Sequence, residues 1–230
     1  MNIETRWWWI RHAPVPSGRG MVYGQLDLPS DCSDSAAFQR LAASLPQNAI
    51  LVTSDLRRTI ETAAAIRNAG HKTGLNLPEP IREPALREQN FGAWQGLSHD
   101  DFAALPDATP HRHWRSAAYI RGPEGENFAD VVARVGPAIH RLTEAHAGAD
   151  IVAVTHGGAI RAALAIALKL DPESALAFSA ENLSLTRLDH IADDQEGAAW
   201  RVTTVNQPHQ SPEPIASGTG APGTGEAERA

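Results

Sequence analysis

Histidines and arginines stand directly after three apolar runs of this sequence. They are Arg11 and His12 after residues 7–10, Arg57 and Arg58 after residues 49–53, and His156 after residues 151–155. A guanidinium group can donate two parallel hydrogen bonds to the oxygens of one phosphate group, and it keeps its charge at any relevant pH. An imidazole beside fixed positive charge tends to stay neutral and nucleophilic, and histidine can form covalent intermediates. This set of side chains therefore indicates chemistry on a phosphoryl group.

The elements that must position these side chains follow from the apolar pattern. Runs that fit strands occupy residues 7–10, 49–53, 151–155, 183–188 and 200–205, and helical patterns occupy residues 54–70, 127–148 and 159–170. This alternation predicts an α/β fold, a three-layer sandwich with a mostly parallel central sheet flanked by helices. Ligands bind outside the carboxyl ends of the strands in such sheets, so we expect the histidines and arginines to converge there. The tryptophans of residues 7–9 fit a strand buried on both faces better than an exposed aromatic platform.

One catalytic domain is expected over residues 1–206, followed by a tail. Residues 207–230 are rich in Pro, Gly, Ser and Thr, and their only large aliphatic residue is Ile215. Such a segment cannot bury enough apolar surface to offset its ordering entropy, so it is predicted to be disordered. Within the domain, residues 76–125 are rich in proline and weakly periodic, which indicates an insertion over the sheet edge.

Composition narrows the class of protein. The net charge of -7 disfavours generic nucleic-acid binding, and no apolar stretch approaches the roughly 20 residues of a membrane span. The single cysteine, Cys32, cannot form an internal disulfide, and the first residues show no secretory pattern, so a cytoplasmic location is expected. His111 and His113 lack a further patterned ligand, so no metal or cofactor is expected. A homodimer is left open.

Five motifs, in order along residues 6–206, resemble those of the histidine phosphatase (phosphoglycerate mutase-like) superfamily. They are Arg11-His12-Ala13, the segment from Ser54 to Ala63, Leu86-Arg87-Glu88, Gly125-Glu126-Asn127 and Thr155-His156-Gly157-Gly158. The resemblance implies that His12 is the phosphorylated nucleophile and that Arg11, Arg58 and His156 hold the phosphate. It implies that Glu88 is the proton donor, against the alternative of an ordinary surface carboxylate.

Further positions are assigned to substrate binding. The resemblance places Gln25 near the leaving group, and Gly157 belongs to the motif of His156. Arg115 and Arg121, in the insertion, are candidate contacts for a substrate anion, the alternative being solvated cations. The sequence departs from the family pattern at Ala13, where glycine is usual. It also lacks an asparagine between Val15 and Gly24, which predicts one polar pocket ligand fewer.

The resemblance implies a metal-independent phosphomonoesterase that acts on a small-molecule phosphate monoester through a phosphohistidine. Its most similar branch is the phosphatase branch, including enzymes of the α-ribazole phosphatase kind. Two alternatives stay open: phosphoryl transfer of the phosphoglycerate mutase type, and a catalytically silent phosphate-binding regulatory module. Binding alone needs neither a nucleophile nor an acid, so His12 and Glu88 together disfavour the silent module. The residues that follow Glu88 lack the added cations and tyrosine that mutases carry there, which favours hydrolysis.

Overall fold

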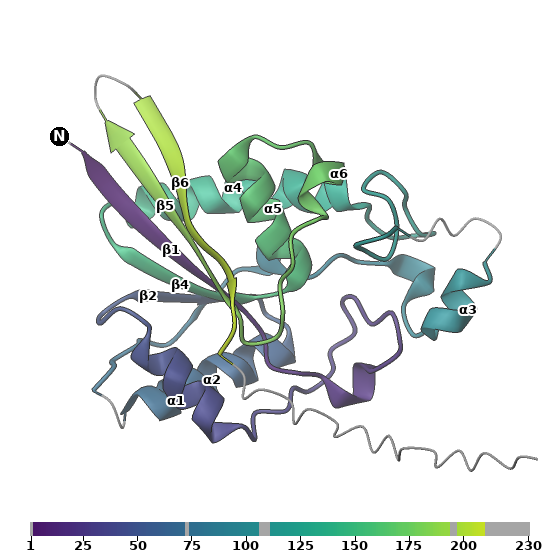
Figure 1. Ribbon diagram of the computed structural model, residues 1–230, viewed down its shortest axis with the longest axis horizontal. Helices are drawn as coiled ribbons and strands as arrows, with labels where there is room; N and C mark the ends of the chain where they lie inside the picture. The colour runs from purple at the N-terminus through teal and green to yellow at the C-terminus, as the bar shows by residue number, and fades with distance from the viewer. Residues whose placement is uncertain (1, 72–73, 106–110, 194–196, 210–230) are drawn as a thin grey trace, which may run out of the picture.

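The computed structural model describes residues 2–71, 74–105, 111–193 and 197–209, and it shows a central sheet with helices on both faces (Figure 1). In these residues the strands are β1 (Ile3–Arg11), β2 (Ile50–Thr53), β3 (Ile81–Arg82), β4 (Asp150–Thr155), β5 (Leu185–Asp193) and β6 (Gly197–Gln207). They form one sheet in the order β3-β2-β4-β1-β5-β6. The strands β1 to β4 pair in parallel, and β5 and β6 are antiparallel. The predicted mostly parallel sheet is confirmed.

The helices cover the two faces of the sheet in separate groups. They are α1 (Ser35–Ala43), α2 (Arg57–His71), α3 (His99–Ala103), α4 (Phe128–Ala145), α5 (Gly157–Leu168) and α6 (Pro172–Ala175). Figure 1 shows α4, α5 and α6 on one side of the sheet, α1 and α2 on the other, and α3 among the loops at one end. This is the three-layer sandwich that the sequence predicts. No helix in the described ranges is long and apolar enough to cross a membrane.

The first strand lies in the middle of the core. Trp7 and Trp9 are fully buried, and their rings stack with centroids 4.7 Å apart. Both belong to the cluster that packs under α4 and α5, and Ile10 belongs to the cluster under α1 and α2. Burial of an aliphatic or aromatic side chain of this size stabilises a fold by about 1.5–3 kcal/mol. The prediction of a strand buried on both faces is confirmed.

Two helices show what local sequence does and does not reveal. Asn127 and Asp130 form the capping box that begins α4, as their spacing predicts. The sequence reading missed α1, whose buried residues Ala37, Phe38, Leu41 and Ala42 have helical spacing and whose N-cap is Asp34. Four small or apolar residues in a nine-residue stretch give a weak signal, and packing against α2 completes the helix.

The insertion begins at the sheet edge and then leaves it. The two residues of β3 pair with β2, and the chain continues through 3-10 turns at Pro84–Leu86 and Gly92–Trp94 to α3. At the other end of the chain, Gln207 still belongs to β6, and the carbonyl oxygen of His209 accepts hydrogen bonds from Arg40. The rest of the tail predicted for residues 207–230, from residue 210 on, lies outside the described residues.

Candidate active site

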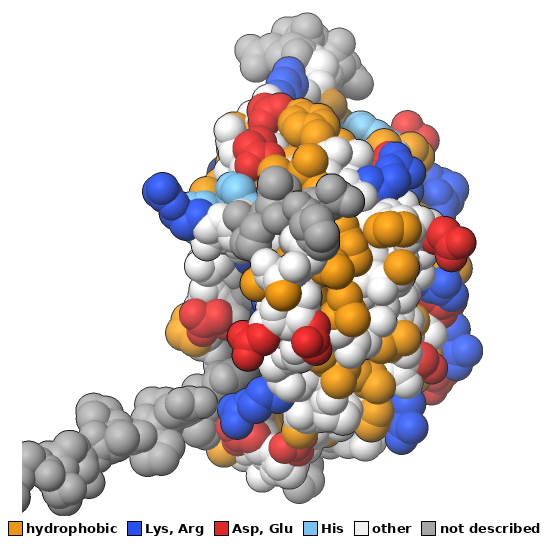
Figure 2. All heavy atoms as spheres, turned by 90° about the vertical axis from the view of Figure 1, so that its right-hand side faces the viewer, with side chains coloured by type: hydrophobic (Ala, Val, Ile, Leu, Met, Phe, Trp, Pro, Cys, Tyr) orange, Lys and Arg blue, Asp and Glu red, His pale blue; other side chains and the backbone are white. Residues whose placement is uncertain are grey.

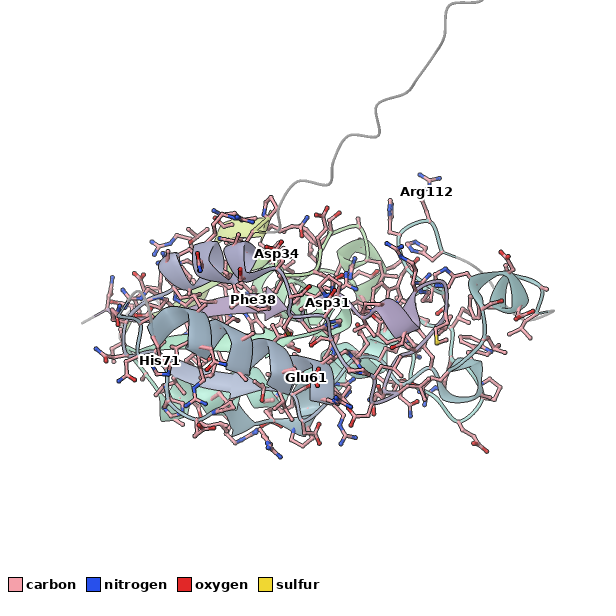
Figure 3. The ribbon with its side chains drawn as sticks, turned by 90° about the horizontal axis from the view of Figure 1, so that it is seen from below. Asp31, Asp34, Phe38, Glu61, His71 and Arg112 are labelled. Carbon is pink, nitrogen blue, oxygen red and sulfur yellow. The ribbon has the colours of Figure 1, made fainter. Side chains whose placement is uncertain are left out.

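The parallel topology brings the predicted residues to one end of the sheet. β1 and β4 are neighbours, with Arg11 opposite Thr155, so His12 and His156 leave the sheet side by side. Their ring centroids are 5.2 Å apart. Arg58 comes from the first turn of α2, which extends from this end, near Glu61, to His71 at the far end (Figure 3). The convergence predicted at the carboxyl ends of the strands is therefore present.

His12 is held as a neutral imidazole with one free nitrogen. It is buried, and its Nδ1 lies 2.7 Å from the carbonyl oxygen of Ala13. Because a carbonyl only accepts, Nδ1 carries the proton and Nε2 keeps its lone pair. Burial, followed by the charges of Arg11 and Arg58, holds the pKa of His12 well below its ordinary value. The side chain is thus neutral and nucleophilic at neutral pH.

The loop around His12 is fixed by residues distant in sequence. The amide of Asn182 donates to the His12 carbonyl oxygen over 2.7 Å, and Thr62 accepts from the Ala13 N–H over 2.9 Å. Ala13 is fully buried, so its methyl group is accommodated where the family pattern has glycine. Asn182 also lines a hollow together with Arg11 and Arg115. An asparagine is therefore present near the pocket, but it comes from the segment before β5.

Arg58 and His156 form a buried pair. Two guanidinium nitrogens of Arg58 donate to the carbonyl oxygens of Gly24 and Leu26, and its Nε donates to His156 Nδ1 over 3.2 Å. Since Nδ1 accepts, Nε2 of His156 carries the proton and donates to Ser54 Oγ over 2.8 Å. Burial, followed by Arg58, keeps the pKa of His156 well below its ordinary value. The pair presents a fixed cation beside a neutral imidazole.

Arg11, whose charge acts on both histidines, carries an unpaired donor. Its Nη1 donates to the Ala180 carbonyl oxygen over 2.7 Å. Its Nε is buried and has no hydrogen-bond partner among the described residues. Buried N–H donors without partners are rare in folded proteins and are costly to leave unsatisfied. An oxyanion beside His12 would satisfy this donor.

Glu88 lies at the first turn of α5. Its side chain is 8% exposed, and Oε1 accepts from the backbone N–H groups of Gln89 and Gly158 over 2.9 and 3.0 Å. No hydrogen bond from a described residue engages Oε2. Glu88, Arg11, Tyr23, Trp114 and Arg115 are among the residues that line a hollow of about 60 Å³. The second carboxyl oxygen is thus available to a group that enters this hollow.

Two glycines after His156 make this arrangement possible. A Cβ atom on Gly158 would overlap Glu88 Oε1, and one on Gly157 would come within 2.9 Å of Arg161 Nη1. A Cβ atom on Gly157 would also stand 3.8 Å from Arg11 Nε. Gly157 therefore lies where the two guanidinium groups meet the first turn of α5. A side chain at either position would displace the end of the Arg161 or Glu88 side chain from its present place.

The remaining predicted residues divide into two groups. Gln25 lies beside Glu88, since its amide donates to the Glu88 carbonyl oxygen over 2.9 Å, and Arg115 lines the hollows next to Arg11. The structure does not bring Arg121 to this group: it is exposed and pairs with Asp130 over 2.7 Å. Arg57, the neighbour of Arg58, also stays apart from this group, because it is exposed and pairs with Glu61.

Sequence reasoning missed Arg161 and Trp114. Arg161 is 8% exposed, donates to the Phe178 carbonyl oxygen over 2.8 Å, and lies 4.5 Å from the centre of the Trp114 ring. Burial lowers its pKa to about 10, so it stays charged at neutral pH. A signal was available, because Arg161 is the only charged residue in the apolar run of α5. A buried charge in such a helix needs a partner.

Arg161 belongs to a third hollow, which is strongly cationic. This hollow has a volume of about 410 Å³. The residues that line it are Arg11, His111, Arg112, His113, Trp114, Arg115 and Arg161. Among the described residues that line it, none is acidic. Figure 3 shows Arg112 pointing away from the body of the molecule. The end that carries α3 has a band of hydrophobic side chains down its middle, with cationic and acidic side chains along its right-hand edge (Figure 2).

Comparison with known proteins agrees with this geometry. The family model of the histidine phosphatase superfamily (branch 1) matches residues 7–203. A glucosyl-3-phosphoglycerate phosphatase of Mycobacterium tuberculosis is 35% identical over 215 residues, which cover 86% of this chain and 92% of that protein. The match thus includes nearly all of the described domain.

Solved structures give the same result. The native structure of a mycobacterial glucosyl-3-phosphoglycerate phosphatase matches with a TM-score of 0.73 and 29% identity, covering 88% of this chain and 99% of that one. A putative α-ribazole-5'-P phosphatase from Escherichia coli matches with a TM-score of 0.67 and 23% identity, covering 89% and 98%. At this lower identity, the similarity to the Escherichia coli protein concerns the fold alone.

Proposed function

The chain belongs to the histidine phosphatase superfamily, and on that premise we propose that it hydrolyses a small phosphorylated metabolite through a phosphohistidine on His12. The observation that carries this proposal is a neutral imidazole with a free Nε2 at His12, next to Arg11, whose charge acts on the imidazole and whose buried Nε has no partner among the described residues. A nucleophile and an oxyanion donor at one point suit attack on phosphorus.

In the first step, His12 Nε2 attacks the phosphorus atom and the bond from phosphorus to the leaving oxygen breaks. Glu88, in its protonated form, gives its proton to that oxygen, so the leaving group departs as an alcohol. Arg11, Arg58 and His156 surround the phosphoryl oxygens, whose charge the two guanidinium groups stabilise during transfer. The product of this step is phosphohistidine with an ionised Glu88.

In the second step, water attacks the phosphohistidine. Glu88 takes a proton from the water as the bond from phosphorus to Nε2 breaks, which releases inorganic phosphate and restores His12 and protonated Glu88. No step requires a metal ion. We expect activity to survive chelators and to be blocked by vanadate, which mimics five-coordinate phosphorus.

His12→Ala tests the proposal directly. The variant should lose turnover, and brief mixing of the parent enzyme with labelled substrate should trap an acid-labile phosphohistidine that the variant does not form. His71→Ala is the matched control, because His71 is exposed at the far end of α2 (Figure 3). Activity that disappears in chelator and returns with a divalent metal would contradict the mechanism.

For the substrate, we propose a phosphomonoester that carries a second anionic group. Arg115 and Arg161 line the cationic hollow, and Arg115 also lines the smaller hollow that contains Glu88, the proposed proton donor to the leaving group. The 35% identical relative is named for a phosphoglycerate derivative, a molecule with a carboxylate near its phosphate. A carboxylate or second phosphate in this hollow would meet guanidinium groups at short range.

Hydrolysis rather than transfer is the expected outcome for the phosphoenzyme. Residues 89–94, which follow Glu88, include no cationic side chain, so they supply no positive charge that would keep a departing sugar phosphate bound. We expect net phosphate release to exceed interconversion of phosphoglycerates. A coupled mutase assay that runs faster than phosphate release from every monoester tested would overturn this assignment. The proposed compartment is the cytoplasm, in keeping with a single cysteine in 230 residues.

A further inference from the structure

The segment of residues 111–118, here the 111–118 loop, brings Trp114 and Arg115 to the site without secondary structure of its own. It contains no helix or strand, so contacts with other elements must set its position. Arg115 lines each of the hollows around Arg11, and Trp114 lines a hollow with Glu88 and contacts Arg161. The placement of both side chains therefore depends on what holds this loop.

Glu173 holds both ends of the 111–118 loop. Its Oε2 accepts from the backbone N–H of Ala118 over 2.6 Å, and its Oε1 lies 3.0 Å from Nε2 of His111. Hydrogen bonds to an ionised acceptor are about twice as strong as neutral ones. One carboxylate thus joins the first and the last residue of the loop.

Glu173 is itself fixed in α6. Asp171, the N-cap of this helix, accepts from the Glu173 N–H over 2.9 Å. Asp171 also accepts from the hydroxyl of Tyr119 over 2.5 Å, directly after the 111–118 loop. The start of α6 therefore serves as the anchor, and Glu173 is the residue that reaches both ends of the loop.

The middle of the loop contacts the substrate side of the site. Trp114 Nε1 donates to Gln89 Oε1 over 2.8 Å, and Gln89 is the neighbour of Glu88. The Trp114 ring also stacks on Arg161. The anchored ends thus determine where Trp114 and Arg115 lie. The hydrogen bonds of the His12, Arg58 and His156 side chains go to other segments of the chain, so the phosphate pocket does not depend on this loop.

We propose that Glu173 is a positioning residue, which holds Trp114 and Arg115 where the leaving group of the substrate binds. This inference rests on the proposed function. Glu173 acts through the 111–118 loop and touches neither the phosphoryl group nor the nucleophile. Its loss should therefore weaken binding of a leaving group that carries an anion and leave the phosphate pocket intact.

Glu173→Ala separates these two effects. Two substrates are compared: 3-phosphoglycerate, which carries a carboxylate, and p-nitrophenyl phosphate, which has no second anion. The KM for 3-phosphoglycerate should rise about tenfold, the effect of losing a hydrogen bond to a charged group. The KM and kcat for p-nitrophenyl phosphate and the inhibition constant of vanadate should stay within about twofold. Glu173→Gln, which keeps an acceptor for the Ala118 N–H, should recover part of the loss.

The control is Glu144→Ala, at an exposed glutamate of α4, which should match the parent enzyme in every measurement. Equal losses on both substrates, weaker vanadate inhibition, or an unchanged KM for 3-phosphoglycerate would each overturn the positioning role. If Glu173→Ala does not fold, the same comparison is made with Glu173→Gln, whose KM for 3-phosphoglycerate should still rise. Failure of the parent enzyme to hydrolyse either substrate would instead count against the proposed function.

Discussion

Gly158→Ala tests whether the absence of a side chain at position 158 allows Glu88, the proposed general acid, to take its position. The Cβ atom that this substitution adds would overlap Oε1 of Glu88, whose carboxylate now accepts the Gly158 N–H. The colliding atom is the end of a flexible side chain, so the carboxylate can move while the fold stays intact. Gly158 lies in the first turn of α5, where alanine is at least as favourable as glycine. We therefore expect the melting temperature to stay within a few degrees of the parent value.

The catalytic effect should be large and should depend on the leaving group. Moving a catalytic group by about 1 Å costs on the order of 10²-fold, and general acid catalysis contributes about 10²–10⁴-fold. An alkyl phosphate needs a proton on its leaving oxygen, whereas p-nitrophenyl phosphate releases p-nitrophenolate, which is stable as an anion. The value of kcat/KM, which reports steps up to phosphoenzyme formation, should fall about 10²-fold for the alkyl ester and only a few-fold for the aryl ester.

A matched glycine provides the control. Gly136 lies inside α4, and a Cβ atom there would stand 3.7 Å from Ile166, at ordinary contact distance. Gly136→Ala should keep full activity and gain up to about 1 kcal/mol of stability from helix propensity. If Gly158→Ala lowers kcat/KM equally for both esters, or for neither, Glu88 is not the acid that this glycine accommodates.

Three further predictions concern other parts of the site. Glu88→Gln, which keeps the shape but removes the transferable proton, should slow alkyl phosphates more than aryl phosphates, and equal losses would show another role for Glu88. Arg161→Met should raise the KM for a monoester with a second anion by about 10–100-fold and spare p-nitrophenyl phosphate, with Arg201→Ala at the opposite end of the sheet as control. Because the Arg161 pKa is about 10, the parent enzyme should lose the same affinity as pH rises through 10. His12 and His156 are neutral when folded and take up protons near pH 6.5 when unfolded, so stability should fall as pH drops from about 7 to 5. The loss reaches up to about 2 kcal/mol for each histidine at pH 5. For His12→Asn, urea unfolding in phosphate-free buffer should show a smaller decrease in the free energy of unfolding between pH 7 and pH 5. A decrease equal to that of the parent enzyme would contradict the assigned pKa directions.

The sequence predicted the sheet and its chemistry because both have local signals. Buried strands such as residues 7–10 are continuous apolar runs, and the side chains that follow them must share one end of a parallel sheet. His12, Arg58 and His156 therefore meet as expected. The helix α1 was missed because its apolar face is small and is completed only by contact with α2.

The finer placement of the site residues depends on contacts between distant segments. Asn182 supports the His12 loop from 170 residues away, a pairing that no local pattern announces. The sequence gives no reason to prefer Arg115 or Arg121 as a substrate contact. In the structure Arg115 lines the hollow that contains Glu88, whereas Arg121 forms an ion pair with Asp130 at the start of α4. Loop residues of one type are told apart only by what packs beside them.

Residue types and their order show which groups are available for phosphoryl chemistry, because residue type fixes charge, nucleophilicity and proton affinity. The state in which these groups act follows from the fold. The Ala13 carbonyl oxygen selects the His12 tautomer, and burial beside Arg11 and Arg58 lowers its pKa. The gap at Gly158 admits the carboxylate of Glu88, and Glu173 fixes the loop that carries Arg115. Each of these effects depends on distances between groups that the fold brings together, and such distances are absent from the order of residues along the chain.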